Sequence, residues 1–162
     1  MRSVRIRVKY VDASAVLRIL FAEPGITVPL GDGDRVVSSQ LVEVETFRAV
    51  DRERLIGGLD DLNAATKRKE LTDLLAMLDL AAIDAAVIAR AKSAFAINVR
   101  ALDAIHVATA EMLAAEAVDE PLEFWTHDER QASAALSRGL AVAGTTPPGI
   151  TERAPERSEN SR

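Results

Sequence analysis

Alternating apolar and polar residues near the start of the chain predict a β-strand. VRIRVKYV (4–11) alternates Val, Ile, Val and Tyr with basic residues, and this period of two places one face of a strand against a core. DASAVLRILFAE (12–23) then changes to the apolar spacing of a helix and ends at Pro24-Gly25. The first quarter of the chain is therefore expected to begin with a strand and a helix.

Strand and helix patterns continue to alternate along the chain. Apolar runs predict strands at 35–37, 122–127 and 140–144, whereas 80–83 is too short to assign. Helical spacing covers 38–55, 59–78, 84–96, 102–117 and 128–139. Expected N-caps are Ser38 or Ser39 for the first of these helices and Asp84 for the third. Gly57-Gly58 and Gly139 are expected to end helices.

This order predicts one α/β domain over residues 1–150. Its centre is expected to be a mostly parallel sheet of four to five strands, flanked by helices as an α/β/α sandwich. The last residues, TERAPERSENSR (151–162), are polar, contain proline and lack periodicity, so we expect a disordered C-terminal tail. The chain contains neither an internal repeat nor a glycine-rich nucleotide-binding motif.

Composition narrows the class of protein. The 162 residues are 48% hydrophobic and 28% charged, which is ordinary for a globular domain. Cysteine is absent, so disulfides and thiolate metal sites are excluded. Without a membrane-spanning run or a signal-peptide pattern, a cytoplasmic protein is expected. The net charge of −5 argues against a broad nucleic-acid surface, although acids that bind cations would also lower the total.

Acidic side chains recur where predicted strands meet predicted helices. Asp12 follows the first strand, Asp128 follows the strand at 122–127, and Asp103 lies at the start of a helix. Glu43 and Glu45 lie in the helix after the strand at 35–37. Because ligands of open α/β sheets bind beyond the carboxyl ends of the strands, these acids are expected to share one cleft.

Carboxylates in one cleft repel each other unless they share a cation. Their oxygen atoms suit hard ions, so we expect Mg²⁺ or Mn²⁺, as one or two ions. Such ions activate water and stabilise in-line displacement at phosphate, which makes hydrolysis of a phosphodiester the expected chemistry.

A purely structural interpretation exists for each aspartate. Asp12 could cap the helix that begins near Ala13, where Ser14 competes for that role. Asp103 could cap its helix or favour its dipole, and Asp128 resembles a capping-box residue with the glutamine three positions later.

Periodicity does not choose between the two glutamates or give a role to the histidines. Glu43 and Glu45 both have apolar neighbours on a helical wheel. His106, one turn after Asp103, is expected to be packed in the core, and His127 is expected to be exposed.

Four motifs in this order resemble those of the PIN-domain ribonucleases, in particular the VapC-like toxins of bacterial toxin–antitoxin modules. They span nearly the whole chain, and each alone is weak. The motifs are YVDASAVLRIL (10–20), SSQLVEVETFRA (38–49), RALDAIHVATA (100–110) and FWTHDERQASAALSRGLAV (124–142).

The resemblance assigns a role to individual residues. The family's acids fall on Asp12, Glu45, Asp103 and Asp128, as the catalytic and metal-binding residues. An S-x-L-x-x-x-E-x-x-R pattern that ends at Arg48 selects Glu45 rather than Glu43. The resemblance also implies that Thr126 and Ser14 support the site by orienting a water or an acid. Phosphate contacts are expected from Arg48 and Arg100.

The resemblance also implies a substrate and partners. These are RNA as the substrate, a cognate antitoxin that occludes the site, and a homodimer. Residues 50–78 are poorly defined by the motifs: the basic run KRK (67–69) could meet RNA, but a solvated helix face is the simpler interpretation. The leucines there could pack in the core, a dimer interface or an antitoxin groove.

Three other interpretations remain open at this point. A PIN-like module could bind RNA or protein without cleaving it. A different acidic-site α/β phosphohydrolase is disfavoured because Ser14 stands where an aspartyl phosphatase has a second aspartate, and a receiver domain would need an adjacent acidic pair beside Asp12. A structural sandwich whose acids are all helix caps would show no stabilisation by cations.

Overall fold

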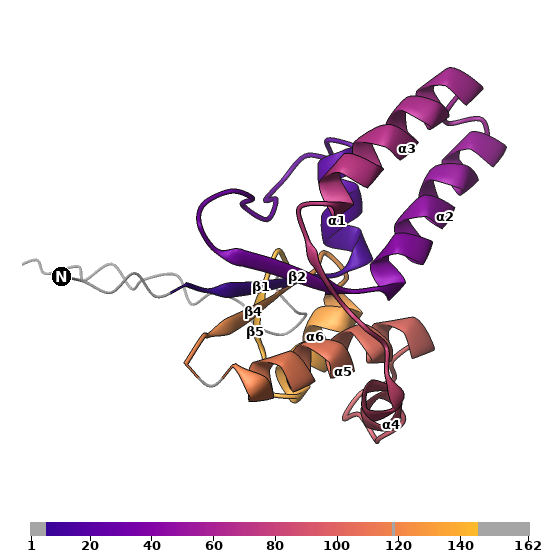
Figure 1. The fold of residues 1–162 in the computed structure, drawn as a ribbon. Helices are drawn as coiled ribbons and strands as arrows, with labels where there is room; N and C mark the ends of the chain where they lie inside the picture. The colour runs from indigo at the N-terminus through magenta and orange to yellow at the C-terminus, as the bar shows by residue number, and fades with distance from the viewer. Residues whose placement is uncertain (1–5, 118, 146–162) are drawn as a thin grey trace, which may run out of the picture.

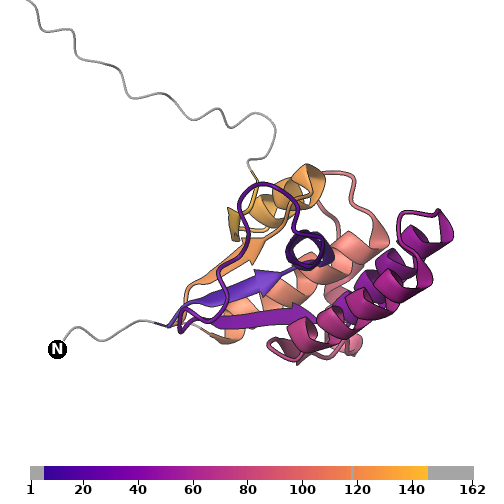
Figure 2. The same ribbon diagram turned by 90° about the horizontal axis from the view of Figure 1, so that it is seen from above.

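The computed structural model describes residues 6–117 and 119–145. Within them, five parallel strands form one sheet in the order β3-β2-β1-β4-β5 (Figures 1 and 2). The strands are β1 (Val8–Val11), β2 (Arg35–Ser39), β3 (Asp79–Ala81), β4 (Leu122–Trp125) and β5 (Ala141–Ala143). The predicted α/β sandwich with a mostly parallel sheet is confirmed.

Six helices in the described part of the chain cover the two faces of the sheet. Helices α1, α2 and α3 lie on one face, and α4, α5 and α6 lie on the other (Figure 1). Each face has its own apolar core, the first around Val11, Val42 and Leu71 and the second around Tyr10, Val107 and Phe124. The helices are α1 (Ala13–Leu20), α2 (Leu41–Leu55), α3 (Asp61–Leu75), α4 (Ala85–Ala91), α5 (Ala101–Glu116) and α6 (Glu129–Ser137).

The strand order reverses between β1 and β4, the point at which α/β sheets bind ligands. Val11 pairs with Trp125, and the Asp12 N–H donates to the Trp125 carbonyl at 3.2 Å. This pairing places Asp12 and Thr126 side by side just beyond the carboxyl ends of the two central strands. The topology therefore creates the site that the acidic pattern predicts.

One predicted helix start is wrong. Ser38 and Ser39 are not N-caps, because β2 continues through both residues and α2 begins at Leu41. Both side chains are buried: the Ser38 hydroxyl donates to the Val11 carbonyl at 2.6 Å, and the Ser39 hydroxyl accepts from the Leu41 N–H at 3.1 Å. The segment at 80–83, left unassigned from sequence, contributes to the short edge strand β3.

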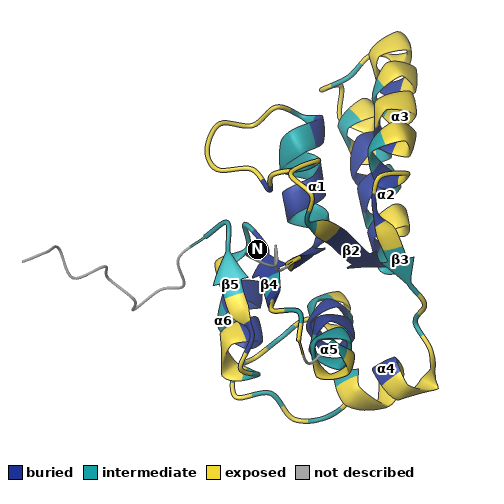
Figure 3. Ribbon diagram, turned by 60° about the vertical axis from the view of Figure 1, so that its left-hand side comes forward, coloured by how far each residue is buried: buried dark blue, intermediate teal, exposed yellow. Residues whose placement is uncertain are grey.

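Helices α2 and α3 form a hairpin that extends beyond the sheet (Figures 1 and 3). The core alternative is confirmed for Leu71 and Leu75 of α3 and for Leu78 after it, whereas Leu62 is 77% exposed and its role stays a prediction. Within the described residues, no helix is long and apolar enough to cross a membrane. The predicted tail at 151–162 and the domain limits at 1 and 150 lie outside the described residues.

The predicted cap of α4 is confirmed and gives a stability test. The Asp84 carboxylate accepts from the Val87 N–H at 2.9 Å at the start of α4. Asp84→Ala is expected to lower the free energy of unfolding by about 1 kcal/mol, because a helix N–H loses its partner. Urea unfolding measures this loss. Asp73→Ala, which removes only an exposed pair with Lys69, is the matched control and should change stability by less than about 0.5 kcal/mol; equal losses in both variants would contradict the cap.

Candidate active site

A cavity of about 390 Å³ brings the four predicted acids together. Asp12 reaches it from the end of β1, Glu45 from α2, Asp103 from the first turn of α5, and Asp128 from the start of α6. These residues are separated by up to 116 positions in sequence. They meet because β1 and β4 are neighbouring strands, α2 follows β2 on the other side of β1, and α5 packs against β2 and β4.

Asp12 is the most buried of the acids, with 3% of its surface exposed. Its carboxylate caps α1 by accepting from the Ala15 N–H at 2.9 Å. The Ser14 and Thr126 hydroxyls each donate to it at 2.7 Å. Burial raises the pKa of Asp12, and these hydrogen bonds oppose that rise. The structure thus places Ser14 and Thr126 where they orient Asp12.

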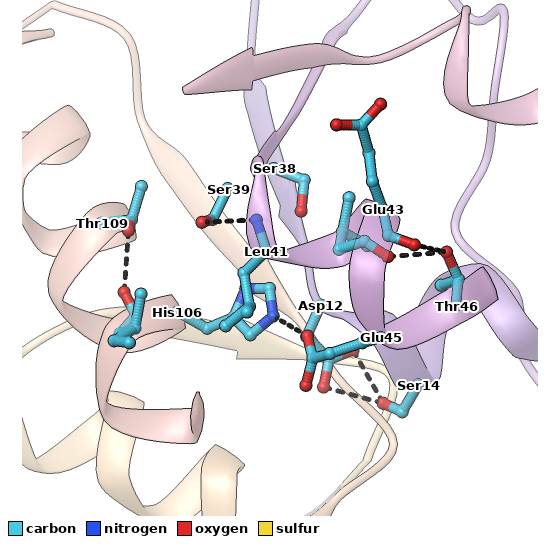
Figure 4. Close-up of polar contacts among 12 residues, drawn as sticks. Asp12, Ser14, Ser38, Ser39, Leu41, Glu43, Glu45, Thr46, His106 and Thr109 are labelled. Carbon is cyan, nitrogen blue, oxygen red and sulfur yellow. Dashed lines mark hydrogen bonds and ion pairs between the residues drawn. The ribbon is translucent and has the colours of Figure 1, made fainter. Parts of the chain in front are cut away.

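Glu45 is held by a buried histidine. His106, 1% exposed, places Nε2 at 2.6 Å from Glu45 Oε2 and Nδ1 at 2.8 Å from the Tyr10 hydroxyl. Figure 4 shows Glu45 beside Asp12, whereas Glu43 points away from both. The structure therefore places Glu45, and not Glu43, in the acidic cavity.

Tyr10, His106 and Glu45 form a hydrogen-bonded chain. The Ser39 N–H donates to the Tyr10 oxygen at 3.2 Å, and in the Nε2-protonated tautomer of His106 the phenol donates to Nδ1. Burial raises the pKa of Tyr10 far above its usual range, so the phenol remains a donor. His106 Nε2 can then donate to Glu45. His106 is packed, as predicted, but its bond to Glu45 was not anticipated; its place one turn after Asp103 was the available signal.

Asp103 is not a helix cap, which corrects one structural interpretation. Helix α5 begins at Ala101 with Arg100 as its N-cap residue, so Asp103 lies inside the first turn, where it favours the helix dipole. Burial raises the pKa of Asp103, and the charges of Asp128, Asp12 and Glu45 raise it further. The negative charges of the other three acids therefore all disfavour the ionised form of Asp103.

Asp128 does cap its helix, as one interpretation predicted. Its carboxylate accepts from the N–H groups of Arg130 and Gln131 at 2.9 and 3.0 Å. In a capping box the side chain of Gln131 would accept from the Asp128 N–H. Here the Asp128 N–H donates to the Thr126 hydroxyl at 3.1 Å instead. Asp128 lines the cavity as well, so capping and facing the cavity coexist in one side chain.

His127 is half-buried, contrary to the expectation of exposure. Its Nδ1 lies 2.9 Å from the Gly144 carbonyl after β5. Burial lowers the pKa of His127, and the nearby Arg18 charge lowers it further. His127 lies two residues after β4, and its burial depends on the segment after β5, 17 positions away in sequence.

The donor set of the cavity fits a hard divalent cation, although the side chains are not gathered around one. Within residues 6–117 and 119–145, no three His, Cys, Asp or Glu side chains form a group that could hold a metal ion. Oxygen atoms of Asp12, Glu45 and Asp128 are engaged by N–H, hydroxyl and imidazole groups instead. Four carboxylates nonetheless converge on one cavity, and burial together with the other three raises the pKa of Asp103. Mg²⁺ or Mn²⁺ suits such oxygen ligands and would offset their repulsion.

The two arginines expected to contact phosphate have different surroundings. Arg48 lines the acidic cavity, but its guanidinium donates to Asp51 at 2.8 Å. Arg100 lines a neighbouring cavity together with Asp128. Arg52, which sequence reasoning did not single out, also lines the acidic cavity. Its position one helical turn after Arg48 was a signal that could have identified it.

Comparison with known proteins gives consistent results. Residues 9–137 match the family model of the PIN domain. Ribonuclease VapC46 of Mycobacterium tuberculosis is 33% identical over 136 residues, which cover 82% of this chain and 94% of that protein. Ribonuclease VapC47 of the same species is 30% identical and covers 83% and 94% of the two chains. The crystal structure of PAE2754 from Pyrobaculum aerophilum shares the fold, with a TM-score of 0.52, 14% identity and coverage of 86% and 85%.

Proposed function

Because this chain belongs to the PIN-domain family, we propose that it is a divalent-metal-dependent endoribonuclease and the toxin of a toxin–antitoxin pair. The two ribonuclease relatives support the class of reaction. The observation that carries the proposal is the convergence of Asp12, Glu45, Asp103 and Asp128 on one cavity at the switch point of the sheet. Such a set of acids can bind a cation and, through it, a phosphodiester.

Each side chain has a separate task in this proposal. A bound Mg²⁺ or Mn²⁺, as one or two ions, would supply an activated water and stabilise the charge that develops at phosphate. Asp12, Glu45 and Asp103 would hold the principal ion, and Asp128 would complete the site. Ser14 and Thr126 keep the Asp12 carboxylate oriented, and His106 keeps the Glu45 carboxylate oriented. Arg100, and Arg48 once released from Asp51, would contact phosphate at the rim.

The partners follow from the family. RNA is the substrate, a cognate antitoxin is the protein that blocks the site, and the protein acts as a homodimer in the cytoplasm. Expression of this chain alone is expected to arrest growth. Co-expression of the protein encoded by a neighbouring short reading frame tests the antitoxin, because an antitoxin should relieve that arrest. Sedimentation of the purified chain tests the dimer, and a monomer at all concentrations would contradict it.

The glutamate pair of α2 gives a direct test of the site. Glu45→Gln is expected to reduce RNA cleavage by more than the roughly 10–100-fold loss typical when a group outside the metal's own ligands is removed. Glu43→Gln is the matched control: it lies two residues away, points out of the site (Figure 4) and should retain cleavage within about twofold of wild type. Gel analysis of RNA fragments measures both variants. Equal cleavage by the two would contradict the assignment of Glu45.

A further inference from the structure

Most cations of the described residues already have a partner within the chain, including the three of the basic run KRK (67–69). Lys67 bonds Glu70 and the Leu20 carbonyl, Arg68 lies over the Phe47 ring at 4.8 Å, and Lys69 pairs with Asp73. The run is therefore committed to contacts within the helical hairpin. A phosphate backbone must be met elsewhere on this acidic protein.

A few arginines lack such partners. In the part of the chain that the structure describes, Arg7, Arg52, Arg100 and Arg130 have exposed side chains with no ion pair, side-chain hydrogen bond or ring contact. Three of these four line the acidic cavity or the one beside it, and only Arg7 does not. Among the described residues of this chain, whose net charge is −5, three of the four arginines without a partner thus lie at the proposed active site, whereas the exposed Lys92, which also has no ion pair, lines neither cavity.

The two cavities meet at Asp128, which lines both. The second is about 670 Å³ and is lined by Arg100, Arg130 and the polar side chains Asn98 and Ser133, among others. Arg52 lines the acidic cavity from α2, whereas Arg100 and Arg130 belong to the start of α5 and of α6. The free arginines therefore flank the acids on two sides.

We propose that single-stranded RNA crosses the acidic cavity from Arg52 to the second cavity, where Arg100 and Arg130 bind the phosphates next to the scissile one. This inference rests on the proposed ribonuclease function and adds the path of the strand. Guanidinium groups bind phosphate oxygens in bidentate fashion, and they offset the repulsion between the acids and the RNA backbone. Three arginine–phosphate contacts around one scissile phosphate fit the binding of a short unpaired RNA element rather than of a long single strand.

The salt dependence of RNA binding tests the path. A fluorescent, mixed-sequence single-stranded oligoribonucleotide is titrated with the Asp103→Asn protein, so that it is not cut, between about 50 and 200 mM KCl. Adding Arg52→Ser, Arg100→Ser or Arg130→Ser is expected to lower the slope of log affinity against log salt by roughly 0.7 each, and all three together by roughly 2. Lysine at the same positions keeps the charge and should restore most of the slope.

The matched control is Arg7→Ser, which removes the free arginine that lines neither cavity. Its slope should equal that of the parent protein. If the three serine variants behave like Arg7→Ser while the wild-type protein cleaves RNA, the path is wrong and the proposed function stands. If the parent protein does not bind RNA and the wild type does not cleave it, both fail. Unchanged melting temperatures verify that the substitutions leave the fold intact.

Discussion

Replacing His106 with leucine is expected to reduce RNA cleavage by about 10- to 100-fold, the loss typical when a group that orients a metal ligand is removed. The substitution takes away the donor 2.6 Å from Glu45 Oε2 and leaves that carboxylate without a fixed orientation. It also removes the His106 partner of the buried Tyr10 hydroxyl, which is expected to lower the free energy of unfolding by about 1–3 kcal/mol. Cleavage rate and urea unfolding together measure the two effects.

Two amides at position 106 separate orientation from general destabilisation. Glutamine places an N–H near the position of the imidazole Nε2 and can still donate to Glu45. Asparagine places an oxygen near Nδ1 and can still accept from Tyr10. We expect the glutamine variant to bind Mg²⁺ more tightly and cleave faster than the asparagine variant, even where their stabilities are equal. Faster cleavage by asparagine would show that His106 acts through packing alone.

Replacing Asp103 with asparagine is expected to stop cleavage and, in the absence of divalent ions, to stabilise the fold at pH 7. The pKa values of Asp103 and Asp12 are raised above the usual 3.8. Their favourable contribution to folding is therefore complete below about pH 3.8 and is lost as the pH rises through the raised values. At pH 7, well above 3.8, burial and the charges of Asp128, Asp12 and Glu45 oppose ionisation of Asp103 in the native state, so replacing it with a neutral amide removes this unfavourable contribution to folding.

Melting temperatures in EDTA and in Mg²⁺ measure this relief. In EDTA the variant should melt above wild type at pH 7, and the gap should narrow as the pH falls toward 4. Added Mg²⁺ should raise the melting temperature of wild type more than that of the variant, because a ligand that binds only the native state stabilises it. A variant that melts below wild type in EDTA would show that Asp103 is a structural residue and not a repelled ligand.

The sequence predicted the strands and helices best where the apolar periodicity was long and glycine or proline marked the turns. Alternation at 4–11 and the helical spacing at 12–23 predict the existence and order of β1 and α1, although both elements are shorter than predicted, at Val8–Val11 and Ala13–Leu20. The error at Ser38 and Ser39 arose because serine is common at helix starts, whereas here both residues belong to β2: the Ser38 hydroxyl bonds the Val11 carbonyl inside the sheet, and the Ser39 hydroxyl accepts from the first N–H of α2. Only the tertiary partner, Val11 on β1, distinguishes these two uses.

The site was predicted less completely than the fold. Junction positions suffice to nominate Asp12, Asp103 and Asp128, but periodicity could not choose Glu45, because Val44 of the same helix is 62% exposed and the apolar stripe of α2 is poorly defined. The bond between His106 and Glu45 joins residues 61 positions apart, and the hydrogen-bonding of His127 depends on β5. Such contacts depend on tertiary structure, which local sequence does not encode.

The central claim is that the acidic cavity cleaves RNA with a divalent cation, and one measurement tests it most directly. Purified protein is incubated with RNA before and after chelation by EDTA, and then with Mg²⁺ added back, and the fragments are counted on a gel. The account predicts that cleavage disappears on chelation and returns with Mg²⁺. Cleavage that persists undiminished in EDTA would contradict it.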